Sequence, residues 1–252
     1  MKALVFAAGL GTRLKPLTDT IPKALVPVGG EPLLSHVITR LKDAGIDDVV
    51  VNVHHFPDQI INYLKSMDNF GINVSVSDER DLLRETGGGI RHARPFLEGA
   101  PFLVHNVDII SDLDIRWFAS QSRPEALSTV LVSDRSTKRY LLFDDDMRMV
   151  GWTNIETGEV KSPYPGLDPS KCRRYAFSGV HLISDRIFTI FDDDGWGERF
   201  PIMDFYIREC AAHPVYGVLP DHLRMMDVGK METIAEAETF LKTLNSYNYG
   251  KR

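Results

Sequence analysis

A glycine-rich run near the N-terminus contains a cation and backbone groups that could bind an anion. Ala7-Ala8-Gly9-Leu10-Gly11-Thr12-Arg13-Leu14 follows a short apolar stretch directly. Glycines at positions 9 and 11 let the backbone turn tightly and bring N–H groups close to an anion, because no Cβ blocks the approach. Arg13 adds a planar guanidinium suited to phosphate oxygens. The run therefore predicts a phosphate-binding loop.

A second cation follows this loop within a rigid segment. Pro22 fixes the backbone just before Lys23, so the lysine ammonium can be held against the same phosphates as Arg13. Two other phosphate loops fit less well. The third glycine of a dinucleotide-binding G-x-G-x-x-G loop is Leu14 here, and the G-K-[ST] of a Walker loop is missing. Leu14 counts against a Rossmann oxidoreductase, as does the lack of an evident ribose-binding acid, and the missing G-K-[ST] excludes a Walker loop.

A second glycine-rich run, Glu85-Thr86-Gly87-Gly88-Gly89, precedes a predicted helix. Three glycines there expose backbone at a helix N-terminus, so that a flat ring or a phosphate can approach closely. The run is therefore a second candidate for contact with a nucleotide.

Along the chain, short apolar runs alternate with longer amphipathic stretches. The first part predicts strands at 4–8, 48–53, 72–76 and 102–106, with helices at 32–44, 58–67 and 89–96. The later part predicts strands at 126–132, 139–143, 148–152, 174–183 and 215–219, with helices at 202–212 and 231–244. Continuous β-branched runs suit parallel strands covered on both faces. We therefore expect an α/β, Rossmann-like fold with a mixed, mainly parallel sheet sandwiched by helices, and a smaller β-rich portion.

Composition excludes several classes of protein. The 252 residues are 43% hydrophobic with a formal net charge of −6, and nucleic-acid-binding proteins usually show a basic excess instead. No stretch approaches the roughly 20 apolar residues that span a bilayer. Cys172 and Cys210 are far apart and lack metal spacing, which indicates reduced thiols and a cytoplasmic protein. We expect no nucleic-acid partner and no membrane partner.

The run from Ala7 to Thr18, followed by Pro22-Lys23-Ala24-Leu25-Val26-Pro27, resembles the signature of the sugar-nucleotidyltransferase family, the sugar-1-phosphate pyrophosphorylases. The resemblance extends over most of the chain, is strongest up to about Asp108 and reappears near Asp227. It implies an enzyme that joins a nucleoside triphosphate to a sugar 1-phosphate and releases pyrophosphate. It also implies one nucleotidyltransferase domain over 1–252, with a nucleotide-binding part at about 1–114 and, at about 115–252, a sugar-binding part and a C-terminal helix.

The resemblance assigns roles to residues of this chain. Asp108, after a predicted strand, and Asp227, before the last helix, match the family's metal aspartates and imply Mg²⁺, which prefers hard oxygen ligands. Arg13 and Lys23 are the implied catalytic residues, because they neutralise the phosphates. The implied nucleotide-binding residues are Ala7, Ala8, Gly9, Gly11, Thr12, Arg13, Lys23, Thr86 and Gly87.

The implied sugar-binding residues are Gly88, Asn106, Trp152, Asn154 and Gly179. Many relatives carry a Glu-Lys-Pro motif whose lysine meets the sugar phosphate, and this chain has Gly151-Trp152-Thr153-Asn154 in that neighbourhood instead. The partner of the sugar phosphate is therefore open, with Asn154 and Arg199 as substitutes.

The substrates are predicted from one short motif. Glu85-Thr86-Gly87-Gly88-Gly89-Ile90 most resembles the uridylyltransferases that act on N-acetylmuramic acid 1-phosphate, which implies UTP, that acceptor and a role in cell wall recycling. Mannose 1-phosphate with GTP, another hexose 1-phosphate and phosphocholine stay open as alternatives. A non-catalytic nucleotide-binding module is the alternative of another class, and the sequence leaves open whether the chain is a monomer or a homodimer.

Overall fold

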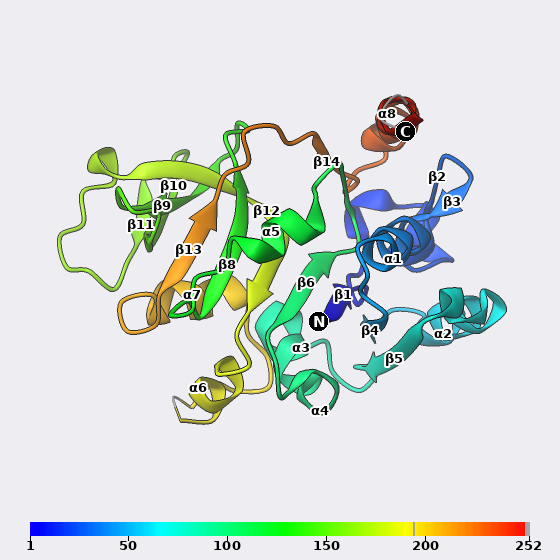
Figure 1. Cartoon of the computed structure of the whole chain (residues 1–252), viewed down its shortest axis with the longest axis horizontal. Coiled ribbons are helices and arrows are strands. Elements are labelled where there is room, and N and C mark those ends of the chain that lie inside the picture. The colour runs from blue at the N-terminus through cyan, green and yellow to red at the C-terminus, as the bar shows by residue number, and fades with distance from the viewer. Residues whose placement is uncertain (194, 250–252) are drawn as a thin grey trace. The chain divides into compact units, whose positions relative to one another are not determined.

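The computed structural model describes residues 1–193 and 195–249, whose course is drawn in Figure 1. The chain forms two compact units and passes between them several times. Unit 1 contains Met1–Leu83, His105–Ile115 and the residues from Leu223 onward; unit 2 contains Arg84–Val104 and Arg116–His222. The glycine run at 85–89 thus lies in unit 2, whereas the loop that starts at Ala7 lies in unit 1. The predicted division near residue 114 stays a prediction.

The sheet of unit 1 is parallel. β4 (Asp48–Val53) pairs in parallel with β1 (Lys2–Phe6) on one side and with β5 (Asn73–Asp78) on the other. Every residue of β4 after Asp48 is buried, as expected for a strand covered on both faces. The helices α1 (Leu33–Asp43) and α2 (Pro57–Ser66) accompany these strands (Figure 1) and bury one apolar face each.

Short elements complete unit 1. β2 (Pro27–Val28) pairs with β3 (Glu31–Pro32), and β7 (Ile109–Ser111) pairs with β14 (Met225–Asp227), both in antiparallel fashion. The last helix, α8, covers Glu232–Tyr249. The four short strands were not predicted, because two or three residues carry no periodic signal.

Unit 2 is rich in antiparallel strands. Its longest strand, β12 (Arg173–Ile183), pairs with β8 (Ser128–Ser133) and β9 (Arg139–Phe143). β10 (Met149–Asn154) lies between β9 and β11 (Glu159–Lys161), and β13 (Val215–Val218) runs parallel to β8. The helices are α3 (Glu85–His92), α4 (Arg94–Leu97), α5 (Ile115–Ser120), α6 (Ile187–Asp193) and α7 (Ile202–Glu209).

The predicted α/β fold class is confirmed, with a mixed arrangement of strands flanked by helices. The predicted strands at 48–53, 102–106 and 139–143 have the predicted bounds, and the second of these is β6 (Phe102–Asn106). The helix predicted at 89–96 is wrong at its start, because α3 begins at Glu85 and contains all three glycines. No described helix combines the length and the apolar character needed to cross a bilayer.

Candidate functional site

The loop after β1 turns at Gly11, which has the left-handed φ of 63°. The N–H of Leu14 and the hydroxyl of Thr18 both donate to the Gly11 carbonyl oxygen, at 2.8 Å each. A Cβ at position 11 would lie 2.7 Å from Cγ2 of Thr18. Both the φ angle and the close approach therefore require glycine here.

The start of this loop is fixed by a buried amide. The N–H groups of Ala7 and Ala8 donate to Oδ1 of Asn52, at 2.7 and 3.3 Å. In the part of the chain that the structure describes, the N–H groups of residues 9–12 have no hydrogen-bond partner. The backbone donors open to an anion are therefore those of Gly9 to Thr12, while the N–H groups of Ala7 and Ala8 serve to hold the loop.

Sequence reasoning missed Asn52. Only 2% of this residue is exposed, and its Nδ2 donates to Oε1 of Glu79 at 2.8 Å, which fixes the orientation of the amide. Asn52 pairs with Phe6 in the sheet, so it sits where β1 ends and the loop begins. The signal in the sequence is a polar residue inside the buried run Val49-Val50-Val51-Asn52-Val53.

Lys23 follows Pro22, whose backbone is extended at φ −68° and ψ 150°, and begins a short 3₁₀ helix. Its ammonium pairs with Oδ2 of Asp108, and only 13% and 16% of the two side chains are exposed. A Cβ at Gly11 would lie 3.1 Å from Cβ of Lys23, so the lysine stem runs beside the glycine turn. The structure thus brings the predicted lysine, the predicted loop and one predicted metal ligand together.

The two predicted metal aspartates are neighbours. Asp108 comes directly before β7, and Asp227 is the last residue of β14, where it pairs with Ile109. The N–H of Val228 donates to the carbonyl oxygen of Asp108 at 2.8 Å. The β7–β14 pair therefore joins two segments that are distant in sequence and places Asp108 beside Asp227.

Arg13 reaches the same place. A Cβ at the buried Gly229 would lie 2.7 Å from Nη2 of Arg13 and 2.7 Å from Oδ1 of Asp227. The guanidinium and the carboxylate therefore both border this glycine, and a side chain at position 229 would displace them. Two cations and two carboxylates meet around Gly11 and Gly229, all within unit 1.

This donor set suits a metal that is shared with a ligand. Magnesium usually takes one or two carboxylates and completes its shell with phosphate oxygens and water. Among the described residues no cluster of three or more His, Cys, Asp or Glu side chains could enclose an ion. Asp108 and Asp227 therefore fit a magnesium ion bound together with phosphates better than a closed structural metal site.

His105 lies three residues before Asp108, and its ring is uncharged near pH 7. Burial lowers its pKa to about 4, with Arg40 acting in the same direction. The ring is therefore neutral at neutral pH, and its Nδ1 lies 2.8 Å from the Asn106 carbonyl oxygen. We assign His105 to the buried support beneath Asp108 and not to proton transfer.

The prediction that the glycine run at 85–89 exposes its backbone is wrong. Gly87 and Gly88 are buried, and their N–H groups donate to the Phe200 carbonyl oxygen at 2.8 and 3.2 Å. A Cβ on Gly87 would lie 2.3 Å from the Phe200 ring, and one on Gly88 would lie 2.1 Å from the carbonyl oxygen of Glu198. These glycines therefore let α3 pack against the segment before α7.

Thr86 is used in the same packing. Its hydroxyl accepts the N–H of Ile202 at 2.8 Å, which satisfies a free donor at the start of α7. Arg199, a candidate partner for the sugar phosphate, instead lies 3.2 Å from Glu85 in an exposed ion pair. These contacts give the run at 85–89 a structural role in unit 2.

The predicted sugar-binding residues lie in several places. Trp152 and Asn154 line a pocket of ≈ 580 Å³ that lies entirely within unit 2. Gly88 lies in α3, and Gly179, at φ 75°, lies where β12 shifts register against β8. Asn106 ends β6 and belongs to unit 1. The pocket therefore unites two of the five predicted residues.

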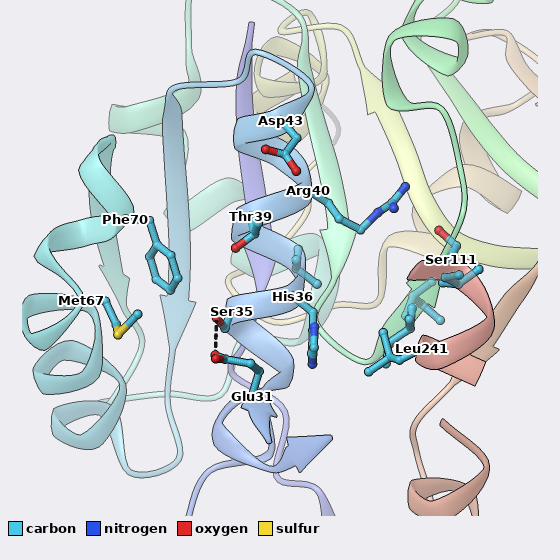
Figure 2. A pocket seen from close by; sticks show the side chains of 14 residues that line it. Glu31, Ser35, His36, Thr39, Arg40, Asp43, Met67, Phe70, Ser111 and Leu241 are labelled. Atoms are coloured by element: carbon cyan, nitrogen blue, oxygen red, sulfur yellow. Dashed lines mark hydrogen bonds between the residues drawn. The ribbon is translucent and has the colours of Figure 1, made fainter. Parts of the chain in front are cut away.

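A separate cavity of ≈ 500 Å³ in unit 1 contains none of the predicted site residues. Figure 2 shows α1 side chains along it, among them Ser35, which donates to Glu31 at 3.1 Å. Arg40 is the one cation of its lining, and its Nη2 is bonded to the Leu113 carbonyl oxygen at 2.6 Å. None of the charged residues around Gly11 lines this cavity.

Known proteins resemble this chain in sequence. A family model described as nucleotidyl transferase matches residues 2–143. The N-acetylmuramate alpha-1-phosphate uridylyltransferase of Caulobacter vibrioides is 34% identical over 249 residues, covering 95% of this chain and 96% of the relative. The enzyme of the same name from Neisseria meningitidis serogroup B is 42% identical over 133 residues, covering 52% of this chain and 58% of the relative.

Solved structures share the fold. The chain aligns with a putative glucose-1-phosphate thymidylyltransferase from Bacillus anthracis, solved with a sucrose, at a TM-score of 0.78 and 20% identity. The alignment covers 95% of this chain and 94% of that one. The likeness therefore extends to both units.

Proposed function

This chain belongs to the nucleotidyl transferase family, and we propose that it transfers the uridylyl group of UTP to N-acetylmuramate 1-phosphate and releases pyrophosphate. It is an enzyme of the sugar-1-phosphate nucleotidyltransferase class. The choice of substrates is supported by the likeness to the Caulobacter vibrioides enzyme, which covers nearly the full length of both chains.

One observation carries the proposal for the site. Lys23, Asp108, Asp227 and Arg13 come from separate stretches of sequence and meet around the open N–H groups of the Gly9–Thr12 turn. Backbone donors and two cations suit the oxygens of a triphosphate, while the carboxylates suit a divalent cation bound to the same phosphates.

The chemistry follows from the charges of the substrates. An oxygen of the sugar 1-phosphate attacks the α-phosphorus of UTP, and a new phosphorus–oxygen bond forms. The bond from the α-phosphorus to its bridging oxygen breaks, and pyrophosphate leaves with the bonding electrons. A phosphate monoester is already anionic, so no protein base is needed, and catalysis consists of positioning and charge neutralisation.

Lys23 is paired with Asp108. Its ammonium has three N–H donors, so it can contact this carboxylate and a phosphate oxygen together. We propose that Lys23 and Arg13 hold the β- and γ-phosphates, while the N–H groups of Gly9 to Thr12 fix the tail in one orientation. Asp108 and Asp227 would hold magnesium, which when bound neutralises charge on the phosphates.

We also propose that the reaction takes place in the cytoplasm. Cys172 and Cys210 are both free thiols, which suits a reducing compartment.

The test of the proposed function is a panel of substrates. Each of UTP, GTP, CTP and dTTP is combined with N-acetylmuramate 1-phosphate, mannose 1-phosphate, glucose 1-phosphate and phosphocholine, and pyrophosphate release is measured. We expect UTP with N-acetylmuramate 1-phosphate to give the highest kcat/KM. A highest value for GTP with mannose 1-phosphate would contradict the proposed substrates. Release with no pair, despite tight nucleotide binding, would indicate a non-catalytic module.

A further inference from the structure

The pocket in unit 2 contains Trp152, Asn154 and two cations. The register of the strands places these cations beside the two predicted residues. Lys161 pairs directly with Trp152 across β10 and β11, and Arg139 pairs with Asn154 across β9 and β10. Directly opposed residues of neighbouring strands point to the same face of a sheet. The four side chains therefore share one face, and all four line the pocket.

This face is the less buried side of β10. Along the strand, Met149, Gly151 and Thr153 are buried, whereas Trp152 and Asn154 are half-buried. Lys161 Nζ lies over the Trp152 ring, 5.4 Å from its centre. The indole therefore holds the ammonium on the pocket face of β10, where its charge suits a ligand that carries a negative group.

Charge on the pocket wall favours an anion. Its charged residues are Arg135, Arg139, Lys161, Glu159 and Asp204, so that cations outnumber carboxylates. Glu159 lies 3.6 Å from Lys161 in an exposed pair, and Nη2 of Arg135 donates to the Phe177 carbonyl oxygen at 3.1 Å.

The Arg139 guanidinium has no hydrogen bond or ion pair with any described residue. It therefore offers all its donors to a ligand. Helix α7 contributes the apolar side chains of Met203 and Ile207 to the lining, and these suit a small alkyl group of the same ligand.

We propose that this pocket binds the sugar ring of the acceptor and that Arg139, with Lys161 beside it, binds a carboxylate carried on that ring. The proposal rests on the proposed function, because it names the acceptor class as acidic sugar 1-phosphates. Arg13 and Lys23, the cations proposed for the phosphates, do not line this pocket, so its own cations are available for a second negative charge.

The experiment compares two acceptors that differ in one charge. N-acetylmuramic acid 1-phosphate is tested beside the same compound with its carboxyl group converted to the primary amide, with UTP and pyrophosphate release as readout. We expect wild-type protein to prefer the acid. Arg139→Gln should raise KM for the acid about tenfold or more, because it removes a charge-assisted hydrogen bond. KM for the amide and kcat for both acceptors should stay within about twofold.

Lys161→Gln provides a second variant, with a smaller rise in KM expected because Lys161 already contacts Glu159. Lys138→Gln is the matched control, since Lys138 is 70% exposed, pairs with Glu156 and does not line the pocket. Binding of each acceptor by isothermal titration calorimetry gives a readout independent of turnover.

Each outcome decides the question. An equal rise in KM for the acid and the amide in Arg139→Gln would show that Arg139 contacts the phosphate or supports the fold, and would overturn the proposal. Equal use of both acceptors by wild-type protein, or an Arg139→Gln variant with unchanged KM, would also overturn it. Failure of wild-type protein with every acceptor would instead remove the proposed function, and this inference with it.

Discussion

Units 1 and 2 use their predicted residues in different ways. In unit 1, Lys23, Asp108 and Asp227 come together from three stretches of chain beside the Gly11 turn. In unit 2, Thr86, Gly87 and Gly88 hold α3 against the chain before α7 through hydrogen bonds and close packing. Charged side chains that serve one polyphosphate must converge. Glycines show only that backbone approaches something closely, which can be a ligand or the protein itself.

The largest stability effect is expected from Gly88→Ala in unit 2. The new Cβ would lie 2.1 Å from a backbone oxygen, so α3 must shift, and we expect a loss of about 2–3 kcal/mol in the free energy of unfolding. Gly9→Ala in unit 1 is the control, because no atom lies within 4 Å of a Cβ there. Urea denaturation measures both. A fully stable Gly88→Ala variant with altered base selectivity would return this run to a ligand-binding role.

Acid should destabilise both units in the same way, because each contains a buried, neutral histidine. Burial lowers the pKa of His105 to about 4 in unit 1 and that of His181 to about 3 in unit 2. Each folded-state value lies below that of the unfolded chain, so stability is complete above pH 6.5 and falls as the unfolded chain takes up protons. We expect a loss of up to about 2 kcal/mol per histidine by pH 5. An unfolding free energy that is equal at pH 7 and pH 5 would contradict the buried, neutral assignment.

The smallest effect concerns the ion pair in unit 1. Because the Lys23 ammonium occupies Asp108, Lys23→Met should raise the affinity for Mn²⁺ alone about fivefold, measured by electron paramagnetic resonance without nucleotide. The same variant should bind UTP more weakly. Lys15→Met is the control, since its pair with Asp19 is exposed. Unchanged or weaker Mn²⁺ binding in Lys23→Met would show that the lysine does not compete for this carboxylate.

Much of the fold and of the unit 1 site could be predicted from the sequence, because local patterns carry both. The apolar run of β4 and the proline before Lys23 determine the local backbone without help from distant residues. The strands at 48–53 and 139–143 accordingly have the predicted bounds. Asn52 was missed because a single polar residue in a strand does not indicate which backbone groups its side chain will bond. The pocket cations were missed because Arg139 and Lys161 acquire their neighbours through strand register, which pairs residues distant in sequence.

The β7–β14 pair illustrates the same limit. Three-residue strands have no readable alternation, yet this pair places Asp227 beside Asp108. Before the structure, that juxtaposition was implied only by the resemblance of both aspartates to a known pattern. The structure adds the physical cause, an antiparallel pair closed by the hydrogen bond from Val228 to Asp108.

Asp108 and Asp227 are proposed to act on one shared ion. The direct measurement is kcat for pyrophosphate release in Asp108→Asn, Asp227→Asn and the double variant, with Asp19→Asn as an exposed control. Each single variant should stay folded and lose about a hundredfold or more in kcat, and the double variant should lose little beyond that, because both carboxylates serve the same step. Near wild-type turnover in either single variant, or losses that multiply in the double variant, would contradict a shared site.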